Sequence, residues 1–98
     1  MVTMHWRVLA SALLTSFKEG PDGAIQSRGL SVITGQELRI EPEVEPDMQS
    51  AHRLAIRLTS QLILREPMSH AEAITAPDGG TLKLEPSPNG RFIRVWRS

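Results

Sequence analysis

His70 and Glu72 are the pair of residues with the clearest chemical potential, because a single residue separates them. On a β-strand, side chains two positions apart project from the same face, so an imidazole and a carboxylate at this spacing are able to hold a metal ion together. Asp78 is a candidate third ligand, but no residue lies at a spacing that is diagnostic of a metal site. Pairs of this kind are common by chance. We therefore expect a solvated strand edge here, with no bound metal and no cofactor.

A cluster of acidic residues also suggests cation binding. Its members are Glu37, Glu41, Glu43, Glu45 and Asp47. Calcium loops place oxygen ligands at tightly alternating positions and need a glycine at their sharp turn. Here Pro42 and Pro46 push the preceding residues towards extended conformations. We therefore expect residues 41–47 to form an extended, solvated connector and not a calcium site.

The histidines are not accompanied by the partners that catalysis needs. His52 lies at the side of a predicted helix, next to Arg53 and Arg57, and no nucleophile is adjacent to it in the sequence. No Gly-x-Ser-x-Gly elbow, phosphate-binding glycine loop or His-Glu-x-x-His motif occurs. The absence of cysteine excludes a thiolate nucleophile and a thiolate zinc site. The sequence therefore predicts no catalytic residue and favours a protein that is not an enzyme.

The C-terminal segment carries Phe92, Arg94 and Trp96 at alternate positions, so a strand would present all three on one face. An aromatic–arginine–aromatic face is able to stack single-stranded nucleotide bases. The alternative is a strand whose apolar atoms pack in the core while the arginine stems cover its rim. Eleven basic residues balance eleven acidic ones and only 4% of the residues are aromatic. We therefore do not expect nucleic-acid binding.

The composition is that of one globular domain spanning residues 1–98, with 40% hydrophobic residues. Small secreted domains often need disulfides, so the lack of cysteine favours a reducing compartment. Residues 1–20 lack the basic start and the cleavage site of a signal peptide, and no apolar run reaches the length of a membrane span. We therefore expect a cytoplasmic protein without a membrane segment.

The clearest secondary-structure element is an amphipathic helix over residues 47–65. Asp47 is the expected N-cap, since its carboxylate is able to accept hydrogen bonds from the free N–H groups of the first turn, and Pro67 stops the helix. The apolar stripe consists of Met48, Ala51, Leu54, Ala55, Leu58 and Leu62. Ile56 and Ile63 lie beyond the stripe and widen the apolar arc, which predicts either a second covering element or a partner.

The N-terminal part of the chain predicts strands with one ambiguity. Apolar residues in residues 5–17 recur at helical spacing, whereas the compact turn at residues 20–23 and the run at residues 24–34 favour a β-hairpin. Both alternatives stay open, and the hairpin is preferred. Residues 29–40 predict a strand, a break at Gly35 and a second strand.

The last third of the chain predicts three strands, over residues 70–76, 81–85 and 91–96. Asp78-Gly79-Gly80 lies between the first two and is typical of a tight hairpin turn, because glycine adopts the positive φ that such turns require. Residues 85–90 are longer and contain prolines, which predicts an open loop.

Three segments of the middle third of the chain are similar to a known family. They are Arg28-Gly29-Leu30, Gly35 with Glu37-Leu38, and the helix that follows from Asp47. In these segments the chain resembles part of an uncharacterised bacterial domain family, a domain of unknown function. The resemblance implies no established activity, and no functional residue is carried over from it.

Together these elements predict a small α+β domain, in which an antiparallel sheet of hairpins packs on one amphipathic helix in the order β-β-(β)-α-β-β-β. The helix stripe and one face of the sheet would form a single core. The expected contributions of the sheet to this core are Val8, Ala10, Val32, Leu38, Leu82, Leu84 and Ile93.

The leading functional hypothesis is a non-catalytic binding or interaction module, either a homodimer or a domain that recognises a protein partner, because monomers rarely expose large apolar patches. Its candidate binding residues are Ile56, Ile63, Phe92, Arg94 and Trp96. The alternative is a small-molecule binder or enzyme whose pocket lies between the helix and the sheet and uses His52, His70 or Glu72. Single-stranded nucleic-acid binding through the C-terminal strand ranks third.

Overall fold

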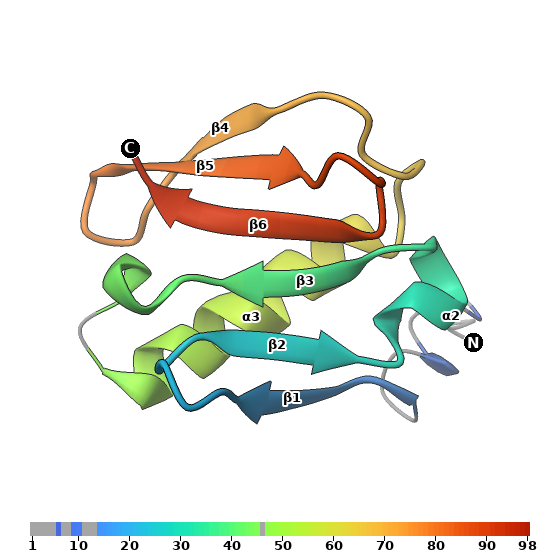
Figure 1. The fold of residues 1–98 in the computed structure, drawn as a ribbon, viewed down its shortest axis with the longest axis horizontal. Coiled ribbons are helices and arrows are strands. Elements are labelled where there is room, and N and C mark those ends of the chain that lie inside the picture. The colour runs from blue at the N-terminus through green and yellow to red at the C-terminus, as the bar shows by residue number, and fades with distance from the viewer. Residues whose placement is uncertain (1–5, 7–8, 11–13, 46) are drawn as a thin grey trace, which may run out of the picture.

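A mixed six-stranded sheet lies against one long helix in the computed structural model, which describes residues 6, 9–10, 14–45 and 47–98 (Figure 1). The elements are β1 (Ser16–Glu19), β2 (Ile25–Arg28), α2 (Leu30–Thr34), β3 (Glu37–Ile40), the 3-10 helix η1 (Pro42–Val44), α3 (Met48–Leu62), β4 (Glu72–Thr75), β5 (Thr81–Pro86) and β6 (Phe92–Arg97). The predicted α+β class is therefore confirmed.

The strand order across the sheet is β1-β2-β3-β6-β5-β4. Neighbouring strands are antiparallel with one exception, since β3 and β6 pair in parallel with Leu38 opposite Ile93 and Ile40 opposite Val95. A connection that contains α3, β4 and β5 makes this parallel pairing possible. The predicted stack of antiparallel hairpins is therefore wrong at the centre of the sheet, where a parallel pair joins the two halves.

The core lies between α3 and the inner face of the sheet. The helix buries its predicted stripe, in which only Met48 is half-exposed. The sheet buries Leu38, Leu82, Leu84 and Ile93, as predicted. Other core residues are Ile25, Leu30, Ile40, Val44, Met68, Ala76 and Val95. Each fully buried aliphatic side chain of this kind contributes about 1.5–3 kcal/mol to folding relative to exposure.

Helix α3 begins as predicted. The carboxylate of Asp47 accepts a hydrogen bond from the Ser50 backbone N–H at 2.8 Å and a second from the Ser50 hydroxyl at 3.2 Å. The backbone hydrogen bond is the main cause that holds the pKa of Asp47 below its ordinary value. Asp47 thus provides an acceptor for the free donors at the start of the helix.

The first hairpin also forms, but with a shorter strand than predicted. Its turn is closed by hydrogen bonds from Gly20 N to Ala24 O at 2.8 Å and from Gly23 N to Gly20 O at 3.0 Å. Phe17 lies in β1, which begins at Ser16, whereas Trp6, Leu9, Ala10 and Leu14 are helical. Each reading of residues 5–17 is therefore right for one part of the segment. Ala10, a predicted core residue, is half-buried, and Val8 lies outside the described residues.

Residues 30–34 are a short helix and not the predicted strand. Glycines at positive φ flank the helix, at 89° for Gly29 and 82° for Gly35. A Cβ atom at Gly29 would stand 2.1 Å from the Leu14 carbonyl oxygen, so only glycine fits there. The prediction of Val32 as a core residue is also wrong, because its helical position leaves it 75% exposed.

The acidic connector is likewise more ordered than predicted. Instead of an extended segment, residues 42–44 form η1 and bury Val44 completely. The Arg97 guanidinium donates a hydrogen bond to the Val44 carbonyl, which ties the connector to the last strand. One apolar side chain among charged neighbours is sufficient to fold this segment onto the core.

The predicted tight turn between β4 and β5 is confirmed, whereas residues 85–90 are not the predicted open loop, because β5 extends to Pro86 and backbone hydrogen bonds close the turn after it. Ala76 N donates to Gly80 O at 2.7 Å, and Gly79 has a φ of 90°, which closes the tight turn between β4 and β5. Between β5 and β6, Ser87 N donates to Phe92 O and Gly90 N donates to Ser87 O, each at 2.8 Å. These turns set the register that places alternate residues of β5 and β6 on opposite faces.

Gln36 joins three parts of the chain from inside the core. Its side-chain nitrogen donates to the carbonyls of Met68 at 2.9 Å and Gly90 at 3.0 Å, and its side-chain oxygen accepts from Met68 N at 2.9 Å. Gln36 is 3% exposed. It therefore connects the start of β3 to the segment after α3 and to the loop between β5 and β6.

Candidate binding surface

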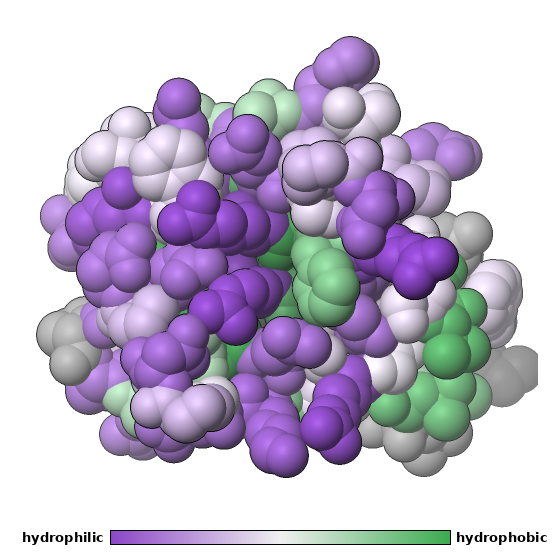
Figure 2. All heavy atoms as spheres, in the orientation of Figure 1, coloured by the Kyte–Doolittle hydropathy of each residue, from purple (hydrophilic) through white to green (hydrophobic). Residues whose placement is uncertain are grey.

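The outer face of the sheet carries the candidate binding residues Phe92, Arg94 and Trp96. Figure 1 shows α3 behind the sheet, and no described helix lies in front of it. Strand alternation and register place on this face Lys18, Gln26, Arg28, Glu37, Arg39, Lys83, Glu85, Phe92, Arg94 and Trp96. Figure 2 views the molecule from this side and shows a mainly hydrophilic face with hydrophobic atoms in a central hollow.

The predicted row of Phe92, Arg94 and Trp96 lies in the middle of this face, on the central strand β6. The two aromatic side chains are half-buried, while Arg94 is exposed. Ile93 and Val95 point the other way and are buried in the core. The sequence therefore predicted the shared face correctly, and the structure places that face towards solvent.

Two cations lie over the indole of Trp96. Lys83 Nζ and the guanidinium carbon of Arg94 are each 5.6 Å from the centre of the ring. Lys83 is opposite Trp96 in the β5–β6 register. Cation–π contacts at exposed sites contribute about 0.5–1 kcal/mol each. They fix a mixed aromatic and basic surface at the centre of the outer face.

A chain of ion pairs crosses the same surface. Glu41 Oε1 accepts hydrogen bonds from Arg39 Nε and Arg94 Nε, each at 3.0 Å. The second partner of Arg39 is Asp22, at 2.7 Å from Nη2. One carboxylate thus holds two arginines of the parallel pair of strands side by side, where their like charges would otherwise repel.

The pKa values within this chain follow from its geometry. Burial has the largest single influence on Glu41 and raises its pKa, but the hydrogen bonds and charges of Arg39 and Arg94 together outweigh burial and keep the pKa below its ordinary value. The Glu41 hydrogen bond, followed by that of Asp22, raises the pKa of Arg39. Asp22, Arg39 and Glu41 are therefore charged near neutral pH.

An open hollow of about 400 Å³ adjoins Phe92. Its lining residues are Ser31, Gly35, Glu37, Arg91 and Phe92. The carboxylate of Glu37 is already occupied by internal donors, since it accepts from Ser27 Oγ at 2.7 Å, Ser31 Oγ at 2.6 Å and the backbone N–H groups of Leu30 and Ser31 at 3.2 Å. The hollow therefore offers an aromatic edge and the Arg91 side chain.

The two isoleucines predicted as binding residues differ in position. Ile56 is 57% exposed on α3, on the side of the helix away from the sheet, whereas Ile63 is 2% exposed and belongs to the core. Ile63 therefore adds nothing to the exposed apolar surface. Because Ile56 lies among the exposed Arg57 and Ser60, the helix contributes an isolated apolar residue and not a patch.

The candidate metal and catalytic residues are spread over the molecule. Glu72 forms an ion pair with Arg65, Asp78 accepts from Gly80 N and pairs with Arg97, and His70 is exposed just before β4. His52 packs edge-on against Phe17 of β1, with ring centres 6.3 Å apart. Since β1 and β4 are opposite edges of the sheet, His52 does not share a site with His70 and Glu72.

Within the part of the chain that the structure describes, no three side chains of His, Cys, Asp or Glu gather closely enough to hold a metal ion. Among the same residues, no helix combines the length and hydrophobicity needed to cross a membrane. The acidic residues of the connector instead make individual contacts, such as those of Glu41 and Asp47 described above.

Sequence reasoning missed several residues of the outer face, including Arg39, Glu41 and Lys83. Their signal was alternation: Arg39 follows the buried Leu38, and Lys83 lies between the buried Leu82 and Leu84. The alternation marks them as outward, but only the β3–β6 and β5–β6 registers bring them beside Arg94 and Trp96.

Comparisons with known proteins found no matching family model, no similar curated protein and no similar solved structure. The resemblance to an uncharacterised bacterial domain family stays a prediction.

Proposed function

We propose that the protein is a non-catalytic interaction module that binds an acidic segment of a partner protein on the outer face of β3, β6 and β5. The observation that supports this proposal is a bare sheet face whose central strand presents Phe92, Arg94 and Trp96, with Lys83 directly beside them. Arginine and aromatic residues are enriched in the centres of protein interfaces.

The shape and charge of the face favour a protein partner over nucleic acid. Acidic groups are interspersed on or beside it, including Asp22, Glu41 and Glu85, so the face offers no continuous row of cations to a phosphate backbone, whereas Arg94 and Lys83 are sufficient for a few carboxylates. Lys83 and Arg94 already lie over the Trp96 ring, which limits base stacking. A peptide carboxylate, by contrast, is able to exchange places with Glu41 at a single arginine.

A pocket between the helix and the sheet has less support, because that space holds the hydrophobic core and the candidate residues lie at opposite edges of the sheet. This arrangement favours an interaction module over a small-molecule enzyme.

The proposal predicts that a glutamate-rich synthetic peptide changes the fluorescence of Trp96. A Trp6→Phe background leaves Trp96 as the single indole, since the chain has two tryptophans. We expect a saturable change that weakens as salt is added, because the attraction is between charges. Arg94→Gln should weaken binding several-fold, because it removes the central cation.

A matched control is Arg53→Gln, which alters an exposed arginine of α3 on the opposite side of the molecule and should leave the affinity unchanged. A lysine-rich peptide and an oligothymidylate serve as alternative ligands. Tighter binding of the oligonucleotide would replace the proposal with nucleic-acid recognition. If none of the three ligands changes the fluorescence of Trp96, a binding role for this face is refuted.

Self-association is a second candidate, favoured by hydrophobic residues near α2 (Figure 1). Val32, Leu14 and Leu9 are exposed, and the Leu14 carbonyl lies beside Gly29 at the N-terminal end of α2. We expect sedimentation across a concentration series to show a dimer that Val32→Asp dissociates. If the protein sediments as a monomer at all concentrations, these residues do not form a dimerisation surface.

A further inference from the structure

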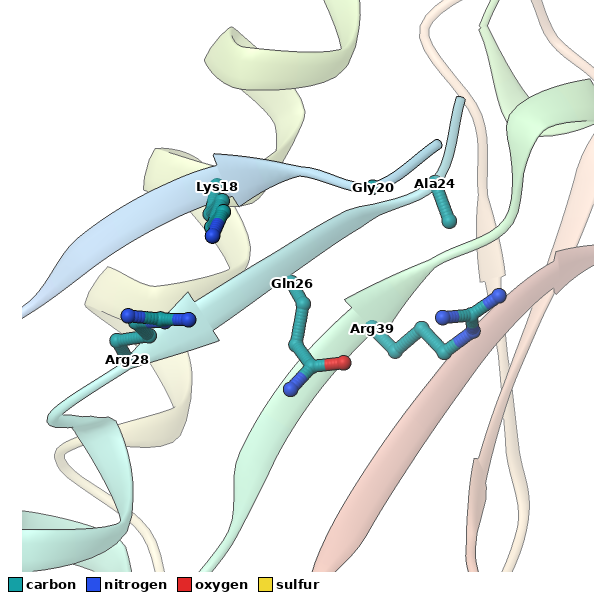
Figure 3. Close-up of a pocket in the computed structure, with 6 residues that line it drawn as sticks. All are labelled: Lys18, Gly20, Ala24, Gln26, Arg28 and Arg39. Carbon is teal, nitrogen blue, oxygen red and sulfur yellow. The ribbon is translucent and has the colours of Figure 1, made fainter. Parts of the chain in front are cut away.

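A second hollow lies on the outer face of the sheet, over its other half. It has a volume of about 170 Å³ and is lined by Lys18, Gly20, Ala24, Gln26, Arg28 and Arg39. Figure 3 shows the side chains of Lys18, Gln26, Arg28 and Arg39 rising from β1, β2 and β3 on the same face. The four long side chains of the hollow are therefore placed by strand register, while Gly20 and Ala24 line it from the hydrogen-bonded turn between β1 and β2.

The register places two cations next to each other in this hollow. Lys18 lies opposite Gln26 and Ser16 lies opposite Arg28, so Lys18 and Arg28 are diagonal neighbours on one face of the β1–β2 hairpin. Side chains at this diagonal spacing are able to contact each other when they are long. Figure 3 shows Lys18 and Arg28 projecting from β1 and β2 on this face, with the Gln26 side chain extending between Arg28 and Arg39.

Neither Lys18 nor Arg28 forms an ion pair with a described residue, whereas Arg39, Arg65, Arg94 and Arg97 all do. The uncompensated pair therefore carries a net positive charge into the hollow. Like charges at neighbouring positions of a sheet destabilise it. An anion bound between them would remove that repulsion.

No acidic side chain lines this hollow. Three other surface hollows each include at least one glutamate, namely Glu41 and Glu45 in one, Glu45 in another and Glu37 in the third. A carboxylate in the wall competes with an anionic ligand for the cations. The hollow over β1 and β2 lacks this competition.

Arg39 lines the hollow with its aliphatic stem and, unlike Lys18 and Arg28, has a paired guanidinium. Its guanidinium is held by Asp22 and Glu41, and Figure 3 shows it directed away from Lys18 and Arg28. Its aliphatic stem therefore forms a wall. The groups available to a ligand are one ammonium, one guanidinium fork and one amide, which together supply two positive charges and several N–H donors.

We propose that this hollow binds a phosphoryl group, held by Arg28 and Lys18 and hydrogen-bonded by Gln26. A phosphate monoester carries about 1.5–2 negative charges near pH 7 and matches two cations, whereas a carboxylate carries one and leaves one cation unpaired. The guanidinium fork binds two phosphate oxygens at once, and the ammonium adds a point charge. The site goes beyond the acidic-segment surface of β6 and has its own residues.

The test is a titration followed by the backbone amide NMR signals of the intact chain. Inorganic phosphate, pyrophosphate, a phosphoserine peptide and its unphosphorylated twin are the probes, with acetate as the single-charge comparison. We expect phosphate to shift the signals of Lys18, Gln26 and Arg28 and acetate to bind more weakly. Lys18→Gln and Arg28→Gln should each weaken phosphate binding about tenfold, as expected for the loss of a charge-assisted hydrogen bond.

Arg57→Gln, which alters an exposed arginine of α3 outside both proposed sites, is the matched control and should leave the phosphate affinity unchanged, while Arg28→Lys should retain more affinity than Arg28→Gln. A free phosphate ligand and a phosphorylated segment are distinguished by whether the phosphopeptide binds more tightly than phosphate itself. The proposal is overturned if phosphate leaves these amides unshifted, if acetate binds equally well, or if both glutamine variants bind phosphate like the parent. The Trp96 titration reports on β6 alone, so each of the two proposals can be refuted without refuting the other.

Discussion

Single residues hold distant segments of this small domain together, and Gln36 is the best example. Its amide has three partners at two backbone positions, Met68 and Gly90, that lie far away in the sequence. Its role was not predicted, because one glutamine beside a predicted strand carries no pattern. Polar side chains inside a core are recognised by the backbone groups they satisfy, and those groups are defined by the fold.

The account predicts that Gln36→Ala destabilises the protein by about 2–4 kcal/mol, because buried backbone groups at Met68 and Gly90 lose their partners. Urea unfolding followed by circular dichroism measures this change. Gln61→Ala alters an exposed glutamine of α3 and should change stability by less than about 0.5 kcal/mol. Equal stability of the two variants would show that the Gln36 contacts contribute little.

The arrangement of side chains on the candidate binding surface was predictable in part. The alternation in the last strand predicted that Phe92, Arg94 and Trp96 share a face. It did not predict Glu41 as the common partner of Arg39 and Arg94, because residues 41 and 94 meet only through the parallel pairing of β3 with β6.

The helices and strands match the sequence-based predictions where local sequence signals agree with one another. They differ from the predictions where tertiary contacts oppose those local signals. The start of helix α3 was predicted closely, because its stripe and its N-cap agree, whereas the helix ends at Leu62 and so before the predicted end at residue 65. Residues 30–34 contain the β-branched Val32, Ile33 and Thr34, which favours a strand. The glycines at both ends and the carboxylate of Glu37 at the first backbone donors favour the helix instead.

Capping of α3 by Asp47 leads to a pH-dependent prediction. The folded protein lowers the pKa of Asp47, so the charged form is stabilised by folding. The contribution of this cap is complete well above the ordinary aspartate pKa of 3.8 and is lost as pH falls through the lower pKa of the folded state.

Asp47→Ala should therefore lower the melting temperature at pH 7, and the difference from the parent should shrink in acid. Thermal melts between neutral pH and pH values below the aspartate range measure this effect. Glu43→Ala removes an exposed carboxylate of η1 and is the matched control. A deficit of Asp47→Ala that stays constant down to the lowest pH would contradict capping by the charged carboxylate.

At the scale of the whole molecule, the sheet is two antiparallel halves joined by one parallel pair. The β1–β2–β3 half comes first in the chain and the β4–β5–β6 half comes last, with α3 between them. Hairpins are visible in a sequence because turn residues mark them. The β3–β6 pairing has no turn to mark it and joins residues more than fifty positions apart, such as Glu37 and Phe92, so the sequence alone did not predict it.

This parallel pair also sets where the two proposed sites lie. It places the Arg39–Glu41–Arg94 chain at the centre of the outer face, between the Trp96 surface on one half and the Lys18–Arg28 hollow on the other. One face of the sheet packs on the core, and the proposed ligands would bind the other. The two proposed sites divide the open face between them.

The central claim is that the open face of the sheet is the binding surface. Its most direct test is a backbone amide NMR titration of the whole chain with the glutamate-rich peptide. The account predicts that shifted signals map to β3, β5 and β6 and include Arg94 and Trp96, while the signals of α3 around Ile56 stay in place. Shifts that gather on the exposed side of α3 and spare β6 would contradict it.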